Sequence, residues 1–406
     1  MKPYLFIFFI LFSINSIFGQ QANKLYDEGV EKMKIQDYKA AINLFSRVLI
    51  INPSFFQANM ERGRCYEIIG KNDSALIDYT NAIEKHKQNP KAYFYRGNFY
   101  YQQKEYRNAL DDLNKAIELK NDVADAWQTR AAVNQALQQY HNAIKDYSKT
   151  LELKPNQAEV FYQRGICYTA IQNIKNAMED YTQSLKINPK QGIVYYHRGL
   201  IYQKEAHYEK ALNDYSNAIK NNFESEDLYF RKADCNYILK KMQEAIGDYS
   251  TLIDRYKIKS ADIFQKRGSA YMSLSDHPNA LKDYNRAIQL DKDSYQTYLQ
   301  RGILNAKMNK STQAIGDFNK AAEINPKYAE PHLEKGKHYF DTKKYQLGVE
   351  ALNAAIKLDS KSAEAFFYRG ACKDFLKDSK GACQDLKKAA ELGHEEAIEI
   401  SKVKCK

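Results

Sequence analysis

Sequence features typical of a catalytic or metal site are scarce in this chain of 406 residues. Its eight histidines are dispersed, and the pair closest to ligand spacing, His332 and His338, is six residues apart and shares no helical face. The sequence has no glycine-rich phosphate loop, no Gly-x-Ser-x-Gly elbow and no Cys-x-x-Cys motif. We therefore expect no catalytic residues, no metal site, no cofactor and no enzymatic activity.

Long apolar runs are also missing, except for one at the start of the chain. Lys2 precedes an apolar run from Tyr4 to Phe12, and a more mixed segment continues to Gly19. This order is typical of a secretory signal peptide over residues 1–19, and the run is short for a membrane span; a retained anchor is the alternative. We expect an exported protein, periplasmic or secreted, without an integral membrane span once the leader is removed.

Charge of one sign is not concentrated anywhere in the chain. The formal net charge is +11, but acidic and basic residues are mixed throughout. A nucleic-acid footprint needs a clustered basic face. The charge pattern therefore predicts no nucleic-acid partner.

What the sequence does have is one pattern repeated eleven times at a spacing of 34 residues. The copies begin at residues 22, 56, 90, 124, 158, 192, 226, 261, 295, 329 and 363, with one extra residue between the seventh and eighth. Such repetition predicts a stacked array over residues 22–394, which is usually a binding surface. Residues 395–406 are expected to form a polar end cap, in which Ala397, Ile398 and Val403 cover the last copy.

Within each copy, apolar residues recur three and four apart in two blocks, which predicts two antiparallel helices. Counted from the first residue of a copy, the eighth and twentieth places hold only glycine or alanine, as in Gly165 and Ala177. Glycine inside a helix costs about 1 kcal/mol relative to alanine, so nine glycines at the eighth place need a packing reason. Bulky residues at the fourth and twenty-fourth places, such as Phe161 and Tyr181, predict a dense core around these small ones.

Cysteine does not form a disulfide framework in this pattern. Four of the six cysteines occupy the tenth place, and we predict that they are buried and reduced: Cys65, Cys167, Cys235 and Cys372. Cys372 and Cys383 lie on the two helices of the last copy, and an exported protein permits a disulfide between them. The sequence does not decide whether this bond forms. Cys405 is expected to be exposed.

The residues at the seventh and twenty-third places of the copies change together from one copy to the next. Nine copies carry arginine or lysine at the seventh place and aspartate at the twenty-third, whereas the first copy has Glu28 with Leu44 and the tenth has Lys335 with Ala351. This covariation predicts an ion pair between a half-buried arginine and its aspartate, with a structural role. A row of ligand-binding arginines is the alternative.

The whole pattern closely resembles the tetratricopeptide repeat family over residues 22–394. The resemblance rests on small, aromatic and proline places that agree in register, although arginine replaces the leucine often found at the seventh place. It implies an all-α, right-handed superhelical solenoid of about eleven antiparallel helix pairs. It also implies that the first helix of each pair lines an inner groove that binds a protein or peptide.

By the family's geometry, the fifth, ninth and twelfth places of the first helices face this groove. Aromatic side chains there offer apolar area, and tyrosines add a hydroxyl, which suits an extended peptide. Packing against neighbouring side chains is the alternative role. The predicted partner-binding residues are Tyr26, Phe94, Tyr101, Tyr162, Tyr196, Phe230, Tyr237, Phe340 and Phe367.

The sequence thus predicts a non-enzymatic scaffold or adaptor that binds a protein or peptide outside the cytoplasm, in a cell-envelope assembly. The alternative is a carrier of an envelope polysaccharide that uses tyrosines as stacking platforms. Asp227, Phe230 and Asp234 are the one place that resembles a saccharide site. An enzyme with a site hidden in the groove is a third and weaker hypothesis.

Overall fold

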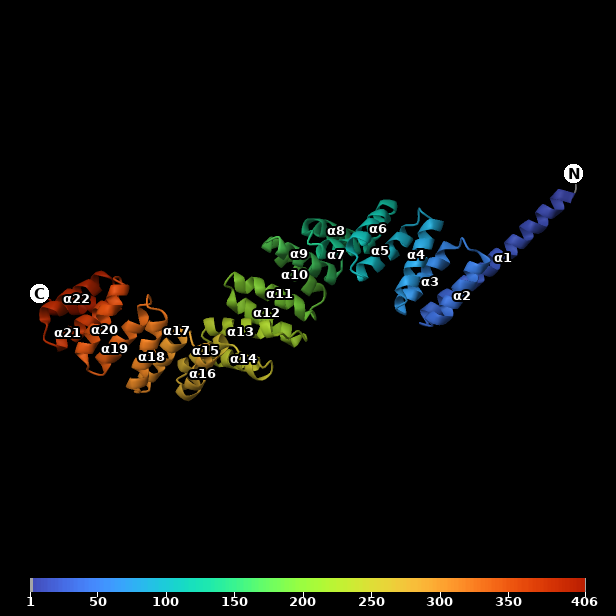
Figure 1. Ribbon diagram of the computed structural model, residues 1–406. Helices are drawn as coiled ribbons and strands as arrows, with labels where there is room; N and C mark the ends of the chain where they lie inside the picture. The colour runs from blue at the N-terminus through green and yellow to red at the C-terminus, as the bar shows by residue number, and fades with distance from the viewer. Residues whose placement is uncertain (1–2, 406) are drawn as a thin grey trace. The chain divides into compact units, whose positions relative to one another are not determined.

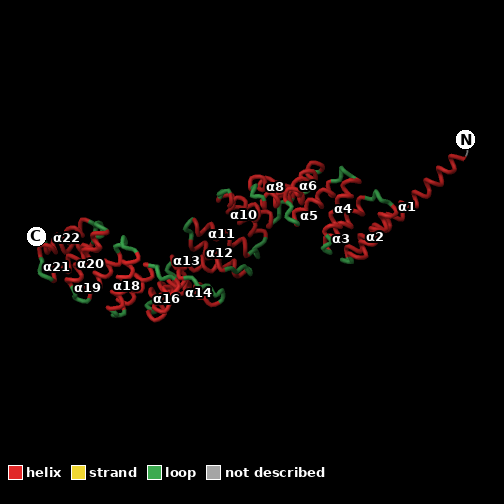
Figure 2. The backbone as a smooth tube through the Cα atoms, viewed as in Figure 1, coloured by secondary structure: helices red, strands yellow, loops and turns green. Residues whose placement is uncertain are grey.

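The computed structural model describes residues 3–405, with side chains from Gly19 onward, and this range contains helices and no strand (Figures 1 and 2). Its contacts divide the chain into two compact units, one ending at Ile201 and one beginning at Tyr202. The side chains of the expected leader, apart from Gly19, lie outside the described residues. Within the described part of the chain, no helix is both long and apolar enough to cross a membrane.

The first unit consists of helices joined by short turns, and the last of them crosses the boundary between the units. They are α1 (Pro3–Lys34), α2 (Tyr38–Ile51), α3 (Phe56–Ile68), α4 (Asn72–Lys85), α5 (Pro90–Gln102), α6 (Tyr106–Leu119), α7 (Ala124–Ala136), α8 (Tyr140–Leu153), α9 (Ala158–Ala170), α10 (Ile174–Ile187) and α11 (Gly192–Lys204).

The second unit has the same construction. Its helices are α12 (Tyr208–Lys220), α13 (Glu226–Ile238), α14 (Met242–Asp254), α15 (Ala261–Ser273), α16 (His277–Leu290), α17 (Tyr295–Lys307), α18 (Ser311–Ile324), α19 (Glu330–Asp341), α20 (Tyr345–Leu358), α21 (Ala363–Phe375), α22 (Ser379–Glu391) and α23 (Glu395–Lys404).

Odd-numbered helices from α3 to α21 are the first helices of the sequence copies, and each begins at or one residue after the start of its copy. The two helices of each hairpin that lies within one unit pack against each other, and successive hairpins of the same unit pack on one another. The structure is therefore an all-α repeat solenoid, as the sequence predicts. The handedness of its winding stays a prediction.

The hairpin turns share a backbone feature that the sequence does not reveal. The fifteenth residue of each copy is in the left-handed conformation, with φ of 62° at Lys104, 59° at Gln172 and 75° at Gly70. Gly70 is the only glycine at this place in the described chain, although the conformation costs other residues roughly 1–2 kcal/mol. The packed helices on both sides therefore impose the turn.

Contact between the eighth and twenty-fourth places explains the glycines. A Cβ atom added to Gly165 would lie 2.6 Å from Cε1 of Tyr181, and one added to Gly302 would lie 2.7 Å from Cε1 of Phe318. Tyr181 and Phe318 are fully buried. The predicted fit of a large side chain against a small one is confirmed, and it lets the two helices of a hairpin touch.

The predicted ion pairs are confirmed in eight copies, and their geometry is nearly constant. In the fourth copy, Nε and Nη2 of Arg130 donate to the two carboxylate oxygens of Asp146, both at 2.8 Å. Asp146 is buried and the arginine side chain is 18% exposed. The other pairs are Arg62 with Asp78, Arg96 with Asp112, Arg164 with Asp180, Lys232 with Asp248, Arg267 with Asp283, Arg301 with Asp317 and Arg369 with Asp385. The ninth predicted pair, Arg198 with Asp214, spans the two units and stays a prediction.

Each arginine also reaches back to the preceding copy. Nη1 of Arg130 donates to Asn114 at 2.8 Å, and Nη1 of Arg164 donates to the hydroxyl of Ser148 at 2.9 Å. Lys335 lacks an aspartate in its own copy but still donates to Asn319 at 2.8 Å. One cation therefore joins the two helices of its own hairpin to the hairpin before it.

The carboxyl end departs from the sequence prediction. Cys383 forms a disulfide with Cys405, so the pairing of Cys383 with Cys372 that the sequence left as an alternative is wrong. Cys405 is buried, although the sequence predicts that it is exposed. Cys372 is free and buried, as are Cys65, Cys167 and Cys235, which confirms that part of the prediction. This disulfide joins residues that are 22 positions apart in the sequence and holds the end of α23 against α22.

The end cap itself is only partly as expected. Ala397 is fully buried and packs with Leu386 and Ala389, and Ile400 contacts the same cluster. Val403 is 75% exposed, so its expected packing is wrong. Cys405, two residues later, is the buried side chain at this end of the chain and is bonded to Cys383.

The tenth copy contains a buried histidine at a place that is apolar in all other copies except the first, which has Glu31. His338 is 6% exposed, and its Nε2 has no hydrogen-bond partner among the described residues. Gly348 in the same copy is required by close contact, because an added Cβ would lie 2.8 Å from Sγ of Cys372. The unpaired imidazole nitrogen, and not the glycine, is therefore the unfavourable feature of this copy.

The hairpin of α17 and α18 offers a matched test of the glycine contact. We expect Gly302→Ala to lower the free energy of unfolding by about 1–3 kcal/mol, because the new methyl group overlaps the ring of Phe318. Gly316→Ala should raise it by about 1 kcal/mol, because nothing lies within 4 Å of the added atom in this exposed helical position. Urea unfolding of the two variants checks both signs, and equal effects would contradict the packing explanation.

Removal of one partner of the ion pair should be costly. We expect Asp146→Ala to destabilise the protein by about 3 kcal/mol, because Arg130 keeps its charge in a half-buried site. The double variant Arg130→Leu with Asp146→Ala should recover much of this loss, because no charge is left unpaired. Thermal unfolding measures the cycle; unchanged stability combined with lost partner binding would instead favour a ligand-binding arginine row.

His338 should make stability depend on pH. Burial lowers the pKa of His338 below its ordinary value of about 6.5, so the unfolded chain binds this proton at higher pH than the folded chain. The corresponding stability is fully present above about pH 6.5 and is lost as the pH falls towards the lowered folded pKa.

We therefore expect His338→Leu to raise the unfolding free energy by about 1–3 kcal/mol at neutral pH and to reduce the loss of stability between pH 7 and 5. The exposed His141 serves as the control, since His141→Gln should leave the pH profile unchanged. An identical pH profile in both variants would show that His338 is not the titrating group.

Candidate partner-binding groove

The predicted groove residues lie on first helices, but the structure does not expose them equally. Tyr162 is buried, and the other eight are half-buried. Three of them line two hollows in the first unit. The three are Tyr26, Phe94 and Tyr101.

The first of these, called here the apolar hollow, has a volume of about 460 Å³. It combines Tyr26 of α1, Met60 of α3 and Phe94 of α5, which occupy the fifth place in three successive copies. The full lining is Tyr26, Phe56, Gln57, Met60, Glu61, His86, Gln88, Asn89, Pro90, Lys91, Phe94, Ala116, Lys120, Val123 and Ala126. The fifth place therefore faces a common cavity in this part of the array.

The rim of the apolar hollow is basic. Lys91 and Lys120 are exposed, and Nζ of Lys120 lies 3.7 Å from Oδ1 of Asp122. The carboxylate of Glu61 accepts a hydrogen bond from Nη1 of Arg64 at 2.6 Å. Burial raises the pKa of Tyr26 to about 12, so its hydroxyl stays neutral and can donate a hydrogen bond. This hollow offers an apolar floor with cationic edges.

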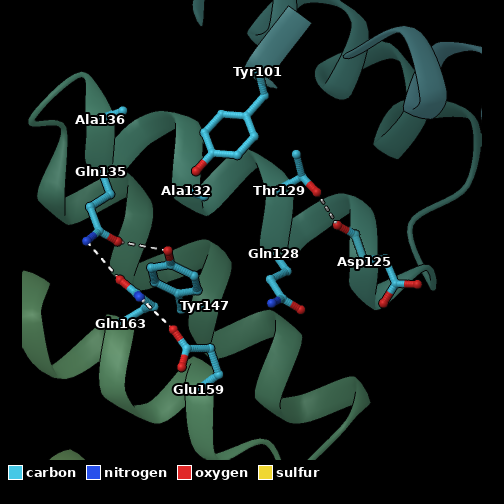
Figure 3. A pocket seen from close by; sticks show the side chains of 10 residues that line it. All are labelled: Tyr101, Asp125, Gln128, Thr129, Ala132, Gln135, Ala136, Tyr147, Glu159 and Gln163. Atoms are coloured by element: carbon cyan, nitrogen blue, oxygen red, sulfur yellow. Dashed lines mark hydrogen bonds between the residues drawn. The ribbon is translucent and has the colours of Figure 1, made fainter. Parts of the chain in front are cut away.

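The second, called here the polar hollow, has a volume of about 540 Å³ and is shown in Figure 3. Tyr101 enters it from α5, and the remaining side chains come from α7, α8 and α9. The lining residues are Tyr101, Asp125, Gln128, Thr129, Ala132, Gln135, Ala136, Tyr147, Glu159 and Gln163. Two carboxylates and no basic side chain belong to this lining.

A chain of hydrogen bonds crosses the polar hollow (Figure 3). The hydroxyl of Tyr147 donates to Gln135 at 2.8 Å, and Nε2 of Gln135 donates to Gln163 at 3.1 Å. Nε2 of Gln163 then donates to Glu159 at 2.7 Å. Because every donor points towards the carboxylate of Glu159, which is exposed, the bonds polarise one another and orient the amides of Gln135 and Gln163.

Asp125 has a different environment. Its carboxylate accepts a hydrogen bond from Nζ of Lys154 at 2.6 Å, and both side chains are more than half exposed. Within the described chain, no basic group is paired with Glu159. Glu159 is therefore the uncompensated charge of the polar hollow.

The two hollows adjoin through shared helices. Phe94 and Tyr101 lie two turns apart on α5, and α7 gives Ala126 to the apolar hollow and Gln128 to the polar one. We call the two hollows together the inner groove of the first unit.

The remaining predicted residues do not line this groove. Tyr162 packs against the rings of Tyr181 and His197, with centroids 6.2 and 5.7 Å away. Phe340 packs on Tyr368, and Phe367 stacks on His394 with centroids 4.1 Å apart. These side chains have the packing contacts of the alternative role, and their part in partner binding stays a prediction.

The other three also contact their neighbours. Tyr196 lies 5.4 Å from the ring of His197, and Tyr237 packs on the core cluster around Tyr249. Phe230 lies under Nζ of Lys266 at 4.6 Å.

The proposed saccharide place is filled by internal partners. Asp234 accepts hydrogen bonds from the hydroxyl of Tyr249 at 2.8 Å and from Nζ of Lys266 at 3.0 Å. The same lysine covers Phe230, and Asp227 pairs with Arg231. Internal partners therefore occupy both carboxylates and the aromatic face here, and saccharide binding at this position stays a prediction.

Most of the polar hollow lies outside the sequence prediction. Gln128 and Gln135 occupy the groove-facing fifth and twelfth places, where the predicted residues are all aromatic. Glu159 and Gln163 lie outside those places, because the neighbouring copy turns them towards the hollow. A run of amides on the first helices of the fourth and fifth copies was the available signal.

Comparison with known proteins agrees with the repeat pattern. Family models described as tetratricopeptide repeat match residues 26–79, 90–122, 124–157, 158–191, 196–257 and 295–328, and one described as TPR repeat matches residues 268–309. The search of curated proteins finds no match.

Several solved structures are similar. The MamA protein is 24% identical, with 43% of this chain and 94% of that one covered and a TM-score of 0.39. PilF of Pseudomonas aeruginosa is 17% identical, with 50% and 92% covered and a TM-score of 0.44. Yeast Tom70 is 14% identical, with 95% and 96% covered and a TM-score of 0.40.

Proposed function

The chain belongs to the tetratricopeptide repeat family, and we propose that it is a scaffold outside the cytoplasm that binds an extended protein segment in the inner groove of its first unit. Proteins of this family bind protein partners and are generally non-catalytic scaffolds. The inner groove is the observation that carries the proposal, because it joins an apolar and a polar cavity on successive first helices.

The size and lining of the groove support an extended partner. The two cavities of about 460 and 540 Å³ are each large enough for side chains, and α5 and α7 connect them. Half-buried aromatics supply apolar contact, whereas amides and hydroxyls supply hydrogen bonds to a peptide backbone. A stacked array offers such a surface without rearranging its core.

The cysteines support an oxidising compartment. A disulfide joins Cys383 and Cys405, and disulfides are rare in cytosolic proteins. The apolar segment from Tyr4 to Phe12 has the composition of an export leader. Both features favour the periplasm or the extracellular space.

A photo-crosslinking amino acid in place of Phe94 tests the proposal. In intact cells we expect a discrete protein adduct, because the side chain lies in the groove, and we expect the chain in the periplasmic or secreted fraction. The same probe in place of Ile77, which is 61% exposed on α4, is the control and should not give this adduct.

Other results would overturn it. Glycan as the sole adduct at position 94 would support the polysaccharide carrier instead. Identical adducts from positions 94 and 77 would remove the groove from the proposal, and recovery in the cytoplasm would contradict the location.

A further inference from the structure

We propose that the inner groove reads two side chains of an extended peptide: an apolar one in the apolar hollow and a lysine or arginine in the polar hollow. This inference rests on the proposed function, since it specifies the partner of the same groove. It commits to a peptide in which the basic residue follows or precedes the apolar one at a fixed spacing.

The charge of the polar hollow selects a cation. Glu159 has one carboxylate oxygen occupied by Gln163, and the described chain provides no basic partner for it. Asp125 at the opposite side of the hollow is already paired with Lys154 and therefore contributes less. An arriving ammonium or guanidinium group would complete the only uncompensated charge in the lining.

The other lining groups fit the same guest. Gln128 provides a carbonyl acceptor, and the ring of Tyr101 provides a π face that attracts cations. The chain of bonds from Tyr147 to Glu159 orients Gln135 and Gln163 before the guest arrives, which reduces the ordering cost of binding.

The apolar hollow disfavours the lysine or arginine of the peptide. Its edges carry Lys91 and Lys120, of which Lys120 lies 3.7 Å from the carboxylate of Asp122, and its one lining carboxylate, Glu61, is already bound by Arg64. A basic side chain would be repelled there, whereas Met60, Phe94 and the neutral Tyr26 offer apolar contact. Attraction in one hollow and repulsion in the other would decide which peptide side chain enters which hollow.

The spacing of the two side chains follows from α5. Phe94 and Tyr101 are seven helical residues apart, which is on the order of 10 Å along the helix. An extended chain covers this distance in about three residues at about 3.3 Å each. We therefore expect an apolar and a basic residue separated by about three positions.

Selection of random peptides displayed on phage against the full purified chain tests this inference. We expect enrichment of an aromatic or aliphatic residue with lysine or arginine about three positions away. The enriched peptide, labelled with a fluorophore, should then bind Glu159→Gln at least tenfold more weakly than the unaltered protein.

The matched control is Glu84→Gln, which removes the same charge from an exposed site on α4 and should leave binding unchanged. A second measurement replaces the basic residue of the peptide by methionine, which should weaken binding to the unaltered chain but not to Glu159→Gln. Circular dichroism of both protein variants verifies that they are folded.

The outcomes separate this inference from the proposed function. Selected peptides that bind in the groove without a basic residue, or that bind Glu159→Gln equally well, would overturn the inference and leave the scaffold role intact. A failure to select any peptide that Phe94→Ala weakens would overturn both.

Discussion

Close contact between the two helices of each hairpin is the constraint from which the rest of the structure follows. It needs a side chain no larger than a methyl group at the eighth place, because the ring or branched chain at the twenty-fourth place fills the space, as with Gly165 and Tyr181. Glycine in a helix is unfavourable by about 1 kcal/mol, but the contact buries a whole aromatic ring. The geometry of this crossing then sets the position of every other side chain in the copy.

The arginine at the seventh place turns separate hairpins into an array. Arg130 uses two nitrogens for Asp146 and a third for Asn114 of the preceding copy, and its guanidinium lies 4.7 Å from the ring of Trp127. A planar group with five donors can make these contacts together, whereas lysine cannot. In the tenth copy only part of this network is present. Lys335 keeps the hydrogen bond to the preceding copy but has no aspartate to pair with in its own copy.

This division of roles leaves the first helices free for recognition. Small residues and ion pairs hold the helices together, so the fifth and twelfth places are not all needed for stability. In the first four copies the fifth places line the apolar and polar hollows, whereas Tyr162 in the fifth copy and Phe340 and Phe367 near the end of the array pack on their neighbours. One repeat pattern therefore gives different surfaces in different copies.

The sequence by itself determined the helix pairs, their starts, the small and large places and the ion pairs, because these depend on contacts at fixed separations along the chain. Gly302 with Phe318 and Arg130 with Asp146 are both sixteen residues apart, and periodicity reports such separations directly.

Only the tertiary structure decided which groove residues are free, since that depends on side chains from neighbouring copies: Lys266 covers Phe230, and His197 packs on Tyr162. It also decided the pairing of Cys383 with Cys405, because the last helix folds back by an amount that no repeat specifies. The polar hollow likewise appears only when Glu159 and Gln163 of one copy meet Gln135 and Tyr147 of another.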